Sequence, residues 1–279
     1  MYSRILATVN EHLTSEVAGL YSLHIAKVSK AHLYLAYIAE KGTSEENLKR
    51  AEDAVKKLFR MAEKSGIKVE AIFDTGDFKK KIKELIERKK IDILFAATSR
   101  GERQGKYNLG SSARSLLKLP VSTCLIRVVH FGRLHPKKIL IPLKSEIDHI
   151  DERAYFSALL SRTFDSEIHL FHITKPPGRF FHGEMHLTPV ELEKNLSKDM
   201  LLFIERLQKY GIFFEKKLSH GTPSRDITIE AASRRFDLIV MGASTRGFLS
   251  SLLEKSPLEY VMQKTPCNLL IFKPAHEDK

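Results

Sequence analysis

The chain has 279 residues, of which 43% are hydrophobic, and a formal net charge of +12. That length suits two domains that each bury a core, and the hydrophobic content excludes a disordered chain. No run approaches the roughly eighteen apolar residues of a membrane span, and the first residues enter a strand-like stretch that leaves no room for a signal peptide. Cys124 and Cys267 lie in apolar runs, where we expect reduced, buried thiols. We therefore expect a globular cytoplasmic protein.

In chain order, the first half is predicted to contain a strand at 5–9, a helix at 15–28, a strand at 32–38, a long helix at 45–65, a strand at 69–73, a helix at 78–88, a strand at 91–97, a loop rich in Gly, Ser and Arg, a short helix at 113–118 and a strand at 121–128. Apolar, β-branched strands that alternate with helices imply an α/β fold, in which helices cover both faces of a parallel sheet.

The positive charge is spread along the chain. Its densest runs, residues 79–83 and 88–90, lie in or beside a helix-like segment whose other face is apolar. They lack the interleaved aromatic residues of a surface that binds single strands, and no helix-turn-helix or zinc-finger signature accompanies them. We expect a solvated helix face and no nucleic-acid partner.

The second half of the chain repeats the first. The strand-like segment 5–10 recurs at 139–144, and the segment 92–97 recurs at 237–242. A period near half the chain indicates two copies of one domain, which we expect at 1–130 and 136–279. The short connector between them predicts domains that pack together. The second copy also carries an insertion at 175–183, rich in Pro and Gly, which predicts a surface loop at the C-terminal edge of its sheet.

Three segments of the second copy carry a family resemblance, and the first copy has weaker equivalents. They are residues 240–247 (Val-Met-Gly-Ala-Ser-Thr-Arg-Gly), 256–261 (Ser-Pro-Leu-Glu-Tyr-Val) and 265–272 (Thr-Pro-Cys-Asn-Leu-Leu-Ile-Phe); the equivalents are 75–77, 98–101 and 110–111. In this order, repeated twice, the chain resembles a tandem universal stress protein. The resemblance implies an open, twisted, Rossmann-like five-stranded parallel sheet in each domain, with strand order 3-2-1-4-5. It also implies that the fifth strands pair the domains into an intramolecular pseudo-dimer.

The resemblance further implies that many members bind ATP or AMP, while others do not. In such a strand order the chain reverses between strands 1 and 4, which opens a crevice at their C-terminal ends. A Gly-rich loop after strand 4 brings backbone N–H groups close to phosphates, and the N-terminus of the next helix favours anions. The nucleotide-binding members resemble a pattern of Gly, two residues, Gly, nine residues, Gly and then Ser or Thr, with an Asp at the end of strand 1.

Domain two keeps the start of this pattern in Met241-Gly242 and the hydroxyl in Ser256. Thr245 stands where the second Gly should be and adds a side chain where backbone should approach phosphate. Pro257 follows the hydroxyl and removes an N–H donor. Lys144 occupies the position of the strand-1 Asp.

Domain one keeps different parts. Gly101 and the run Gly110-Ser111-Ser112 supply backbone donors and a hydroxyl, while Ala97 or Thr98 stands at the position of the first Gly. Asn10 replaces the strand-1 Asp, and its amide can still hydrogen-bond an adenine or a ribose.

The predicted nucleotide-binding residues are Asn10, Ile38, Gly101, Gly110, Ser111 and Ser112 in domain one, and Pro142, Leu143, Ile173, Met241, Gly242, Ser244, Thr245 and Ser256 in domain two. Because neither copy keeps the full pattern, two hypotheses stay open: a non-catalytic stress or regulatory protein that binds ATP or AMP in at least one domain, and an interaction scaffold with degenerate sites. A weak ATP hydrolase is disfavoured, since no general base adjoins a phosphate loop. We expect no catalytic residue and no metal site. The protein partner and a further homodimer stay open.

Overall fold

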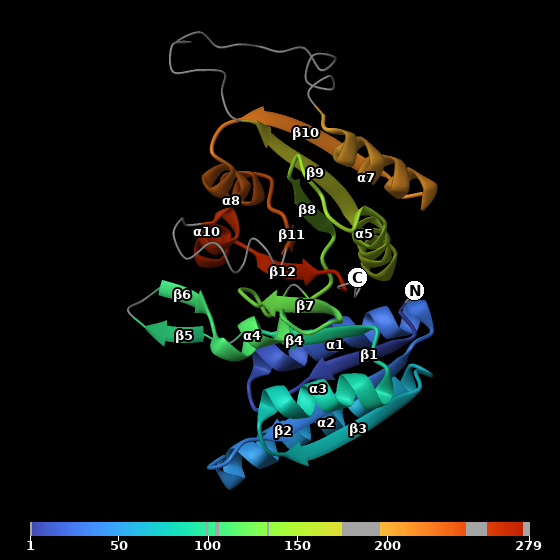
Figure 1. Cartoon of the computed structure of the whole chain (residues 1–279), viewed down its shortest axis with the longest axis vertical. Helices are drawn as coiled ribbons and strands as arrows, with labels where there is room; N and C mark the ends of the chain where they lie inside the picture. The colour runs from blue at the N-terminus through green and yellow to red at the C-terminus, as the bar shows by residue number, and fades with distance from the viewer. Residues whose placement is uncertain are drawn as a thin grey trace.

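The computed structural model of the chain describes residues 2–98, 100–103, 106–132, 134–174, 196–243 and 256–275. The main strands of the first half are β1 (Arg4–Thr8), β2 (His32–Ala39), β3 (Val69–Thr75), β4 (Ile93–Ala97) and β7 (Ser122–Arg127). Those of the second half are β8 (Lys138–Leu143), β9 (Glu167–Thr174), β10 (Phe214–His220), β11 (Leu238–Gly242) and β12 (Asn268–Lys273). They form one ten-stranded sheet in the order β10-β9-β8-β11-β12-β7-β4-β1-β2-β3 (Figure 1). Each half therefore has the order 3-2-1-4-5, which confirms the predicted fold.

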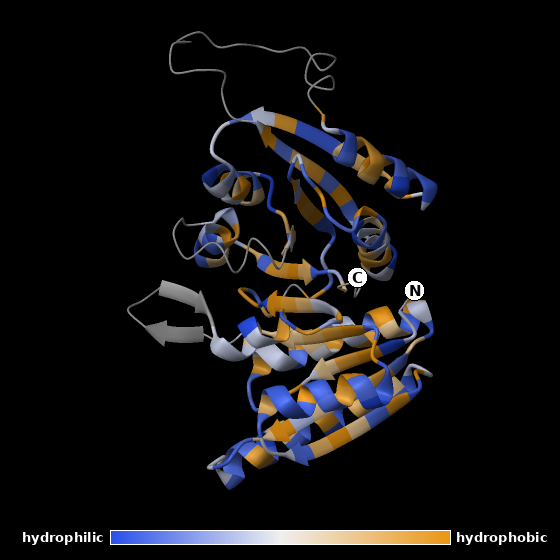
Figure 2. Cartoon of the chain, viewed as in Figure 1, coloured by the Kyte–Doolittle hydropathy of each residue, from blue (hydrophilic) through white to orange (hydrophobic). Residues whose placement is uncertain are grey.

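Helices cover both faces of the sheet. On one face lie α1 (Leu13–Ser29), α2 (Glu45–Lys64), α5 (Ile150–Phe164) and α7 (Lys198–Lys209). On the other lie α3 (Phe78–Lys89), α4 (Ser111–Leu116), α8 (Pro223–Ser233) and α10 (Pro257–Lys264). Because both faces are covered, the central strands are mainly apolar, whereas the outer helices carry polar stripes (Figure 2). This burial explains why the strands read as continuous apolar runs in the sequence.

Short polar residues begin several of these helices. Ser44, Asp77, Ser197 and Ser256 precede α2, α3, α7 and α10, and each accepts a hydrogen bond from the backbone N–H three residues further on. Such caps satisfy one of the unpaired N–H groups of the first turn. No helix among the described residues is long and apolar enough to cross a membrane.

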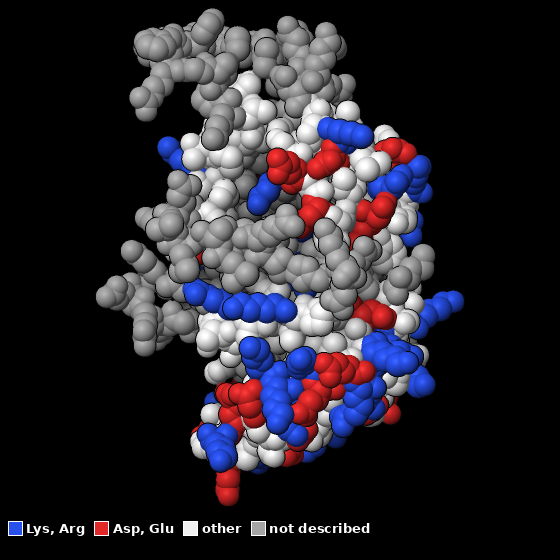
Figure 3. Space-filling model, in the orientation of Figure 1, with Lys and Arg blue, Asp and Glu red and all other residues white. Residues whose placement is uncertain are grey.

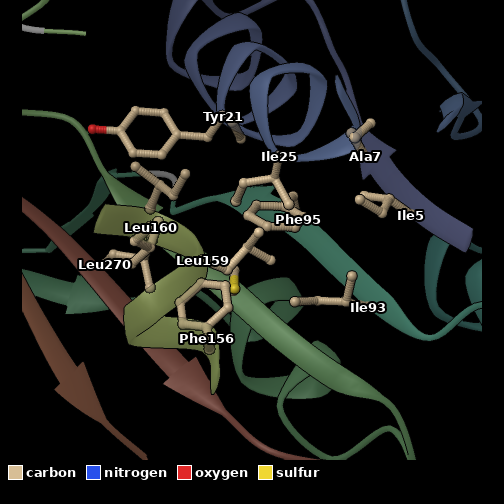
Figure 4. Close-up of a cluster of buried hydrophobic side chains, with 14 of the residues drawn as sticks. Ile5, Ala7, Tyr21, Ile25, Ile93, Phe95, Phe156, Leu159, Leu160 and Leu270 are labelled. Atoms are coloured by element: carbon tan, nitrogen blue, oxygen red, sulfur yellow. The ribbon is translucent and has the colours of Figure 1, made fainter. Parts of the chain in front are cut away.

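The two halves share one sheet and one core. The strands β7 and β12 pair antiparallel, with Leu125 opposite Ile271, whereas the other neighbouring pairs of this sheet are parallel. The pairing through the fifth strands that the resemblance implies is thus confirmed. On the α1 and α5 face, side chains of both halves meet in one cluster (Figure 4). The rings of Tyr21 and Phe164 lie 5.0 Å apart across this boundary.

The segment after β4 in the first half differs from the prediction. Where a loop was expected, β5 (Arg100–Arg103) and β6 (Lys106–Leu109) form an antiparallel hairpin, in which Gly101 lies opposite Asn108. The strand β6 contacts α10 of the second half. The two strands of the hairpin form backbone hydrogen bonds with each other. They therefore need no alternation of apolar and polar residues, and the sequence shows no strand pattern here. The predicted insertion at 175–183 lies outside the described residues.

Candidate functional site

The topology creates one crevice in each half. The order reverses between β1 and β4 in the first half and between β8 and β11 in the second, and ligands of open α/β sheets bind at the C-terminal ends of such strands. Because β7 and β12 run antiparallel, the C-terminal ends of the strands in the two halves point in opposite directions, and so do the two crevices.

In the first half, the turn that follows β1 is fixed by two short polar side chains. The amide oxygen of Asn10 accepts a hydrogen bond of 3.1 Å from the backbone N–H of His12. The Ser15 hydroxyl accepts one of 2.9 Å from the N–H of Asn10 and lies within 3.0 Å of the carbonyl oxygens of Asn10 and His12. Ser15 is only 2% exposed. These contacts hold Asn10 just beyond β1, at the C-terminal edge of the sheet.

The other predicted residues of the first half are distributed along the same edge. Ile38 is buried near the end of β2, next to β1 in the sheet. Gly110 precedes α4, whose first residues are Ser111 and Ser112. Gly101 lies in β5, where its backbone belongs to the hairpin. The structure thus keeps Asn10 and Ile38 at the C-terminal ends of the neighbouring strands β1 and β2, while a hairpin separates the end of β4 from Gly110.

In the second half, an arginine occupies the corresponding region. Arg153, in the first turn of α5, donates from Nη1 to the Phe272 carbonyl oxygen at 3.2 Å and from Nη2 to that of Ala243 at 3.1 Å. Its Nη2 also pairs with the Asp148 carboxylate at 2.6 Å. The side chain is 11% exposed. The guanidinium therefore ties together the C-terminal ends of β11 and β12.

This arginine gives Gly242 a structural role. A Cβ atom on Gly242 would lie 2.5 Å from Nη1 of Arg153, far closer than such atoms approach in proteins. In the first half, the backbone N–H of Thr98 donates to the Ile126 carbonyl oxygen. In the second half, the N–H of Ala243 donates in the same way to the Phe272 carbonyl oxygen, so the residues before these donors, Ala97 and Gly242, are equivalent. Helices α1 and α5 end at residues in the left-handed conformation, Lys30 and Asp165. When the two helices are aligned on these residues, the buried Ala18 of α1 stands at the position of Arg153 in α5. The first half therefore has no arginine at this position and tolerates a side chain on β4.

The remaining predicted residues of the second half lie on four elements. Pro142 and Leu143 end β8, and the Leu143 carbonyl accepts a hydrogen bond of 2.9 Å from Nδ1 of the buried His172. Ile173 is partly buried near the end of β9, and Met241 is buried in β11. Ser256 caps α10. Ser244 and Thr245 lie outside the described residues.

Sequence patterns did not reveal Arg153, His172 or the contact between His220 and Thr174, whose ring nitrogen and hydroxyl are 2.6 Å apart. A single arginine in a helix and single histidines in strands carry no motif. These residues could have been found by aligning the two copies of the domain, because Arg153 aligns with Ala18 and His172 aligns with Tyr37.

A partly buried acid, Glu152, joins the two halves. The Glu152 carboxylate accepts hydrogen bonds from the Tyr2 hydroxyl at 2.9 Å, from the Ser122 hydroxyl, and from the N–H of Ala275 at 3.2 Å. Burial and this carboxylate raise the pKa of Tyr2. Lys273 is 2% exposed, and burial lowers its pKa to about 8. Its ammonium group donates to the Leu119 carbonyl at 2.6 Å, which adds a further contact between the halves.

The surface charges are mixed. On the face shown in Figure 3, Lys and Arg lie among Asp and Glu. Pairs such as Arg50 with Glu46 and Lys56 with Glu52 follow the helical spacing of four residues. Across the described residues, no three His, Cys, Asp or Glu side chains gather in a way that could hold a metal ion. Cys124 and Cys267 are buried, and they are not joined by a disulfide bond.

Comparison with known proteins agrees with this architecture. The Universal stress protein family matches residues 1–127 and again residues 136–273. A universal stress protein of Methanocaldococcus jannaschii is 26% identical over 150 residues, which cover 52% of this chain and 87% of that protein. The crystal structure of a universal stress protein from Archaeoglobus fulgidus aligns with a TM-score of 0.66 at 18% identity, over 97% of this chain and 98% of that one.

The cytoplasmic domain of a prokaryotic cation chloride cotransporter has a similar fold, with a TM-score of 0.63 at 11% identity over 100% of this chain and 98% of that one. Identities this low establish the fold alone. The two family matches span most of the sequence, in the two halves that the sheet joins. The chain therefore belongs to the universal stress protein family and contains two such domains in tandem.

Proposed function

We propose that this protein is a non-catalytic stress or regulatory protein of the cytoplasm that binds an adenine nucleotide, ATP or AMP, in domain one. We place the domains at 1–130 and 136–279 and assign domain two the role of structural partner. Two buried cysteines that are not joined by a disulfide bond suit a reducing compartment. The observation that carries the proposal is a difference between the two halves, because Arg153 lies against Gly242 in domain two, whereas the small Ala18 holds the equivalent position in domain one.

The binding groups in domain one would be Asn10 and the start of α4. The Asn10 side chain sits in a turn already ordered by Ser15, so its position costs little to fix when a ligand binds. Its amide nitrogen is a donor suited to an adenine or ribose acceptor. Gly110 and Ser111 lead into α4, where backbone N–H groups suit phosphate oxygens.

A second candidate function is an interaction scaffold without nucleotide. The hairpin β5–β6 favours it, since this segment replaces an open loop after β4 and contacts α10 of the other domain. The similar fold of a transporter's cytoplasmic domain is compatible with such a role.

Titration calorimetry of ligand-free protein with ATP and with AMP separates the two candidates. We expect binding in the wild type, about tenfold weaker binding in Asn10→Ala through the loss of one hydrogen bond, and no binding in Gly110→Val. Gly110 has φ −59° and ψ 159°, which valine adopts readily, so this variant keeps its backbone.

The matched control is Lys144→Ala, which changes the equivalent position of domain two and should bind like the wild type. No binding at millimolar nucleotide would overturn the proposal in favour of the scaffold. An equal loss in Lys144→Ala would move the site to domain two. Release of phosphate from ATP above the spontaneous rate, measured in the same samples, would contradict a non-catalytic role.

A further inference from the structure

A cavity of about 680 Å³ lies between the connector of the two domains and the end of α8. The connector supplies His130 and Phe131, the segment after α8 supplies Arg235 and Phe236, and Pro266 closes the side near β12. These residues precede β11 and β12, so the cavity lies at the opposite end of β11 from Gly242. It is therefore separate from the domain-two crevice, and it shares no residue with the domain-one site.

The connector wall of this cavity is held rigidly. Asn268, which is 0% exposed, accepts hydrogen bonds from the N–H groups of Val129 and His130 at 2.8 and 2.9 Å. Its amide nitrogen donates to the His130 carbonyl at 3.2 Å. The His130 ring donates from Nε2 to the Pro266 carbonyl at 2.9 Å. A wall with this many fixed contacts is formed before any ligand arrives, which reduces the cost of binding.

The lining combines apolar surface with positive charge. Phe131 is 50% exposed, although it is a large hydrophobic residue. Arg235 is exposed and forms no ion pair with any residue that the structure describes. None of the described residues that line the cavity is acidic. The nearby Asp237 carboxylate accepts hydrogen bonds from the N–H groups of Lys137 and Lys138. From its described lining, the cavity therefore offers the guanidinium of Arg235 and the exposed ring of Phe131 to a ligand.

We propose that this cavity binds a small aromatic carboxylate. The carboxylate pairs with Arg235, whose planar donor fork suits two parallel hydrogen bonds, and the ring packs against Phe131. The volume lies within the range of small-molecule sites. A phosphate, which carries up to two negative charges, suits it less well, because Arg235 is the one Lys or Arg among the described residues that line the cavity.

Fluorine NMR with fluorobenzoate and its neutral analogue fluorobenzamide tests the proposal on the full chain. We expect the wild type to bind fluorobenzoate about tenfold more tightly than fluorobenzamide, the preference of a charge-assisted pair. Arg235→Gln should bind both equally weakly, and Phe131→Ala should weaken both. Arg235 is exposed, so its replacement should leave the melting temperature unchanged.

Lys90→Gln is the matched control. Lys90 follows α3 and has a φ of 50°, and Arg235 follows α8 and has a φ of 54°. Lys90 does not line the cavity. Its variant should retain the preference for fluorobenzoate. Equal binding of both compounds by the wild type would overturn the proposal. So would a preference that survives in Arg235→Gln, or one that Lys90→Gln removes as well.

Discussion

Replacement of Gly242 by alanine should destabilise the protein through its contact with Arg153. Gly242 has no positive φ, so alanine is compatible with its backbone. The new Cβ would lie 2.5 Å from Nη1 and 3.1 Å from Cζ of Arg153. The guanidinium must then move away from the carbonyl oxygens of Phe272 and Ala243 and from the Asp148 carboxylate.

The size of the effect follows from these contacts. A hydrogen bond to a charged group contributes about 1.5–3 kcal/mol, and partial loss of the two carbonyl contacts predicts a cost of about 2 kcal/mol for Gly242→Ala. In an Arg153→Ala background the clash is absent. There the same change should be neutral or stabilising by about 0.5 kcal/mol, because alanine reduces the conformational entropy of the unfolded chain. The predicted coupling energy between the two positions is therefore about 2 kcal/mol.

Urea unfolding of the wild type, both single variants and the double variant measures this coupling. Ala97→Gly, at the equivalent position of domain one, is the matched control and should show only the modest cost of a glycine in a strand, below about 1 kcal/mol. If Gly242→Ala costs the same free energy with and without Arg153, the structural explanation of this glycine is refuted.

Three further predictions concern the junction of the halves. Burial lowers the pKa of Lys273 from 10.5 to about 8, so the unfolded chain holds this proton to higher pH than the folded chain. The free energy of unfolding should therefore rise by about 3 kcal/mol between pH 8 and pH 10.5. Lys273→Met should flatten this rise in urea unfolding, and an unchanged slope would contradict the role given to Lys273. Burial lowers the pKa of His24, and the neighbouring His135 and Lys27 lower it further. The His24 ring in the folded chain therefore resists protonation, and the protein loses stability as the pH falls below 6.5. His24→Phe should lose less over that range, as melting temperatures would show; parallel curves for the two proteins would argue against it. Glu152→Ala leaves the three donors that meet at this carboxylate without their acceptor and should cost about 3 kcal/mol, whereas Glu152→Gln, which keeps an acceptor, should cost less; equal stability of the two variants would count against the network.

Much of the sheet could be predicted from the sequence, because burial on both faces leaves a local signal. The predicted strand at 91–97 contains β4 (Ile93–Ala97), and the predicted helix at 45–65 matches α2 (Glu45–Lys64). The repeat placed the same elements in both halves. The contact of β7 with β12 was implied by the family resemblance, since two apolar strands do not reveal which partner each will take, and the structure added its antiparallel direction.

The hairpin β5–β6 shows where such reasoning fails. Its residues are mostly polar or Gly, and the two strands pair with one another. Local backbone pairing of this kind leaves no apolar periodicity, so the sequence predicts a loop here. The family's glycine pattern assigned Gly101 to a phosphate-binding loop, although its backbone lies in a strand.

The sequence by itself determined the α/β class and the duplication, because buried apolar runs and their repetition are local properties, while the strand order within each half was implied by the family resemblance. The family pattern also singled out Gly242, as the first Gly of a phosphate-binding loop. Only the tertiary structure decided that a side chain at this position would clash with the guanidinium of Arg153, 89 residues earlier in the chain. Contacts between residues so far apart depend on how helices pack over strand ends, and no spacing in the sequence encodes them.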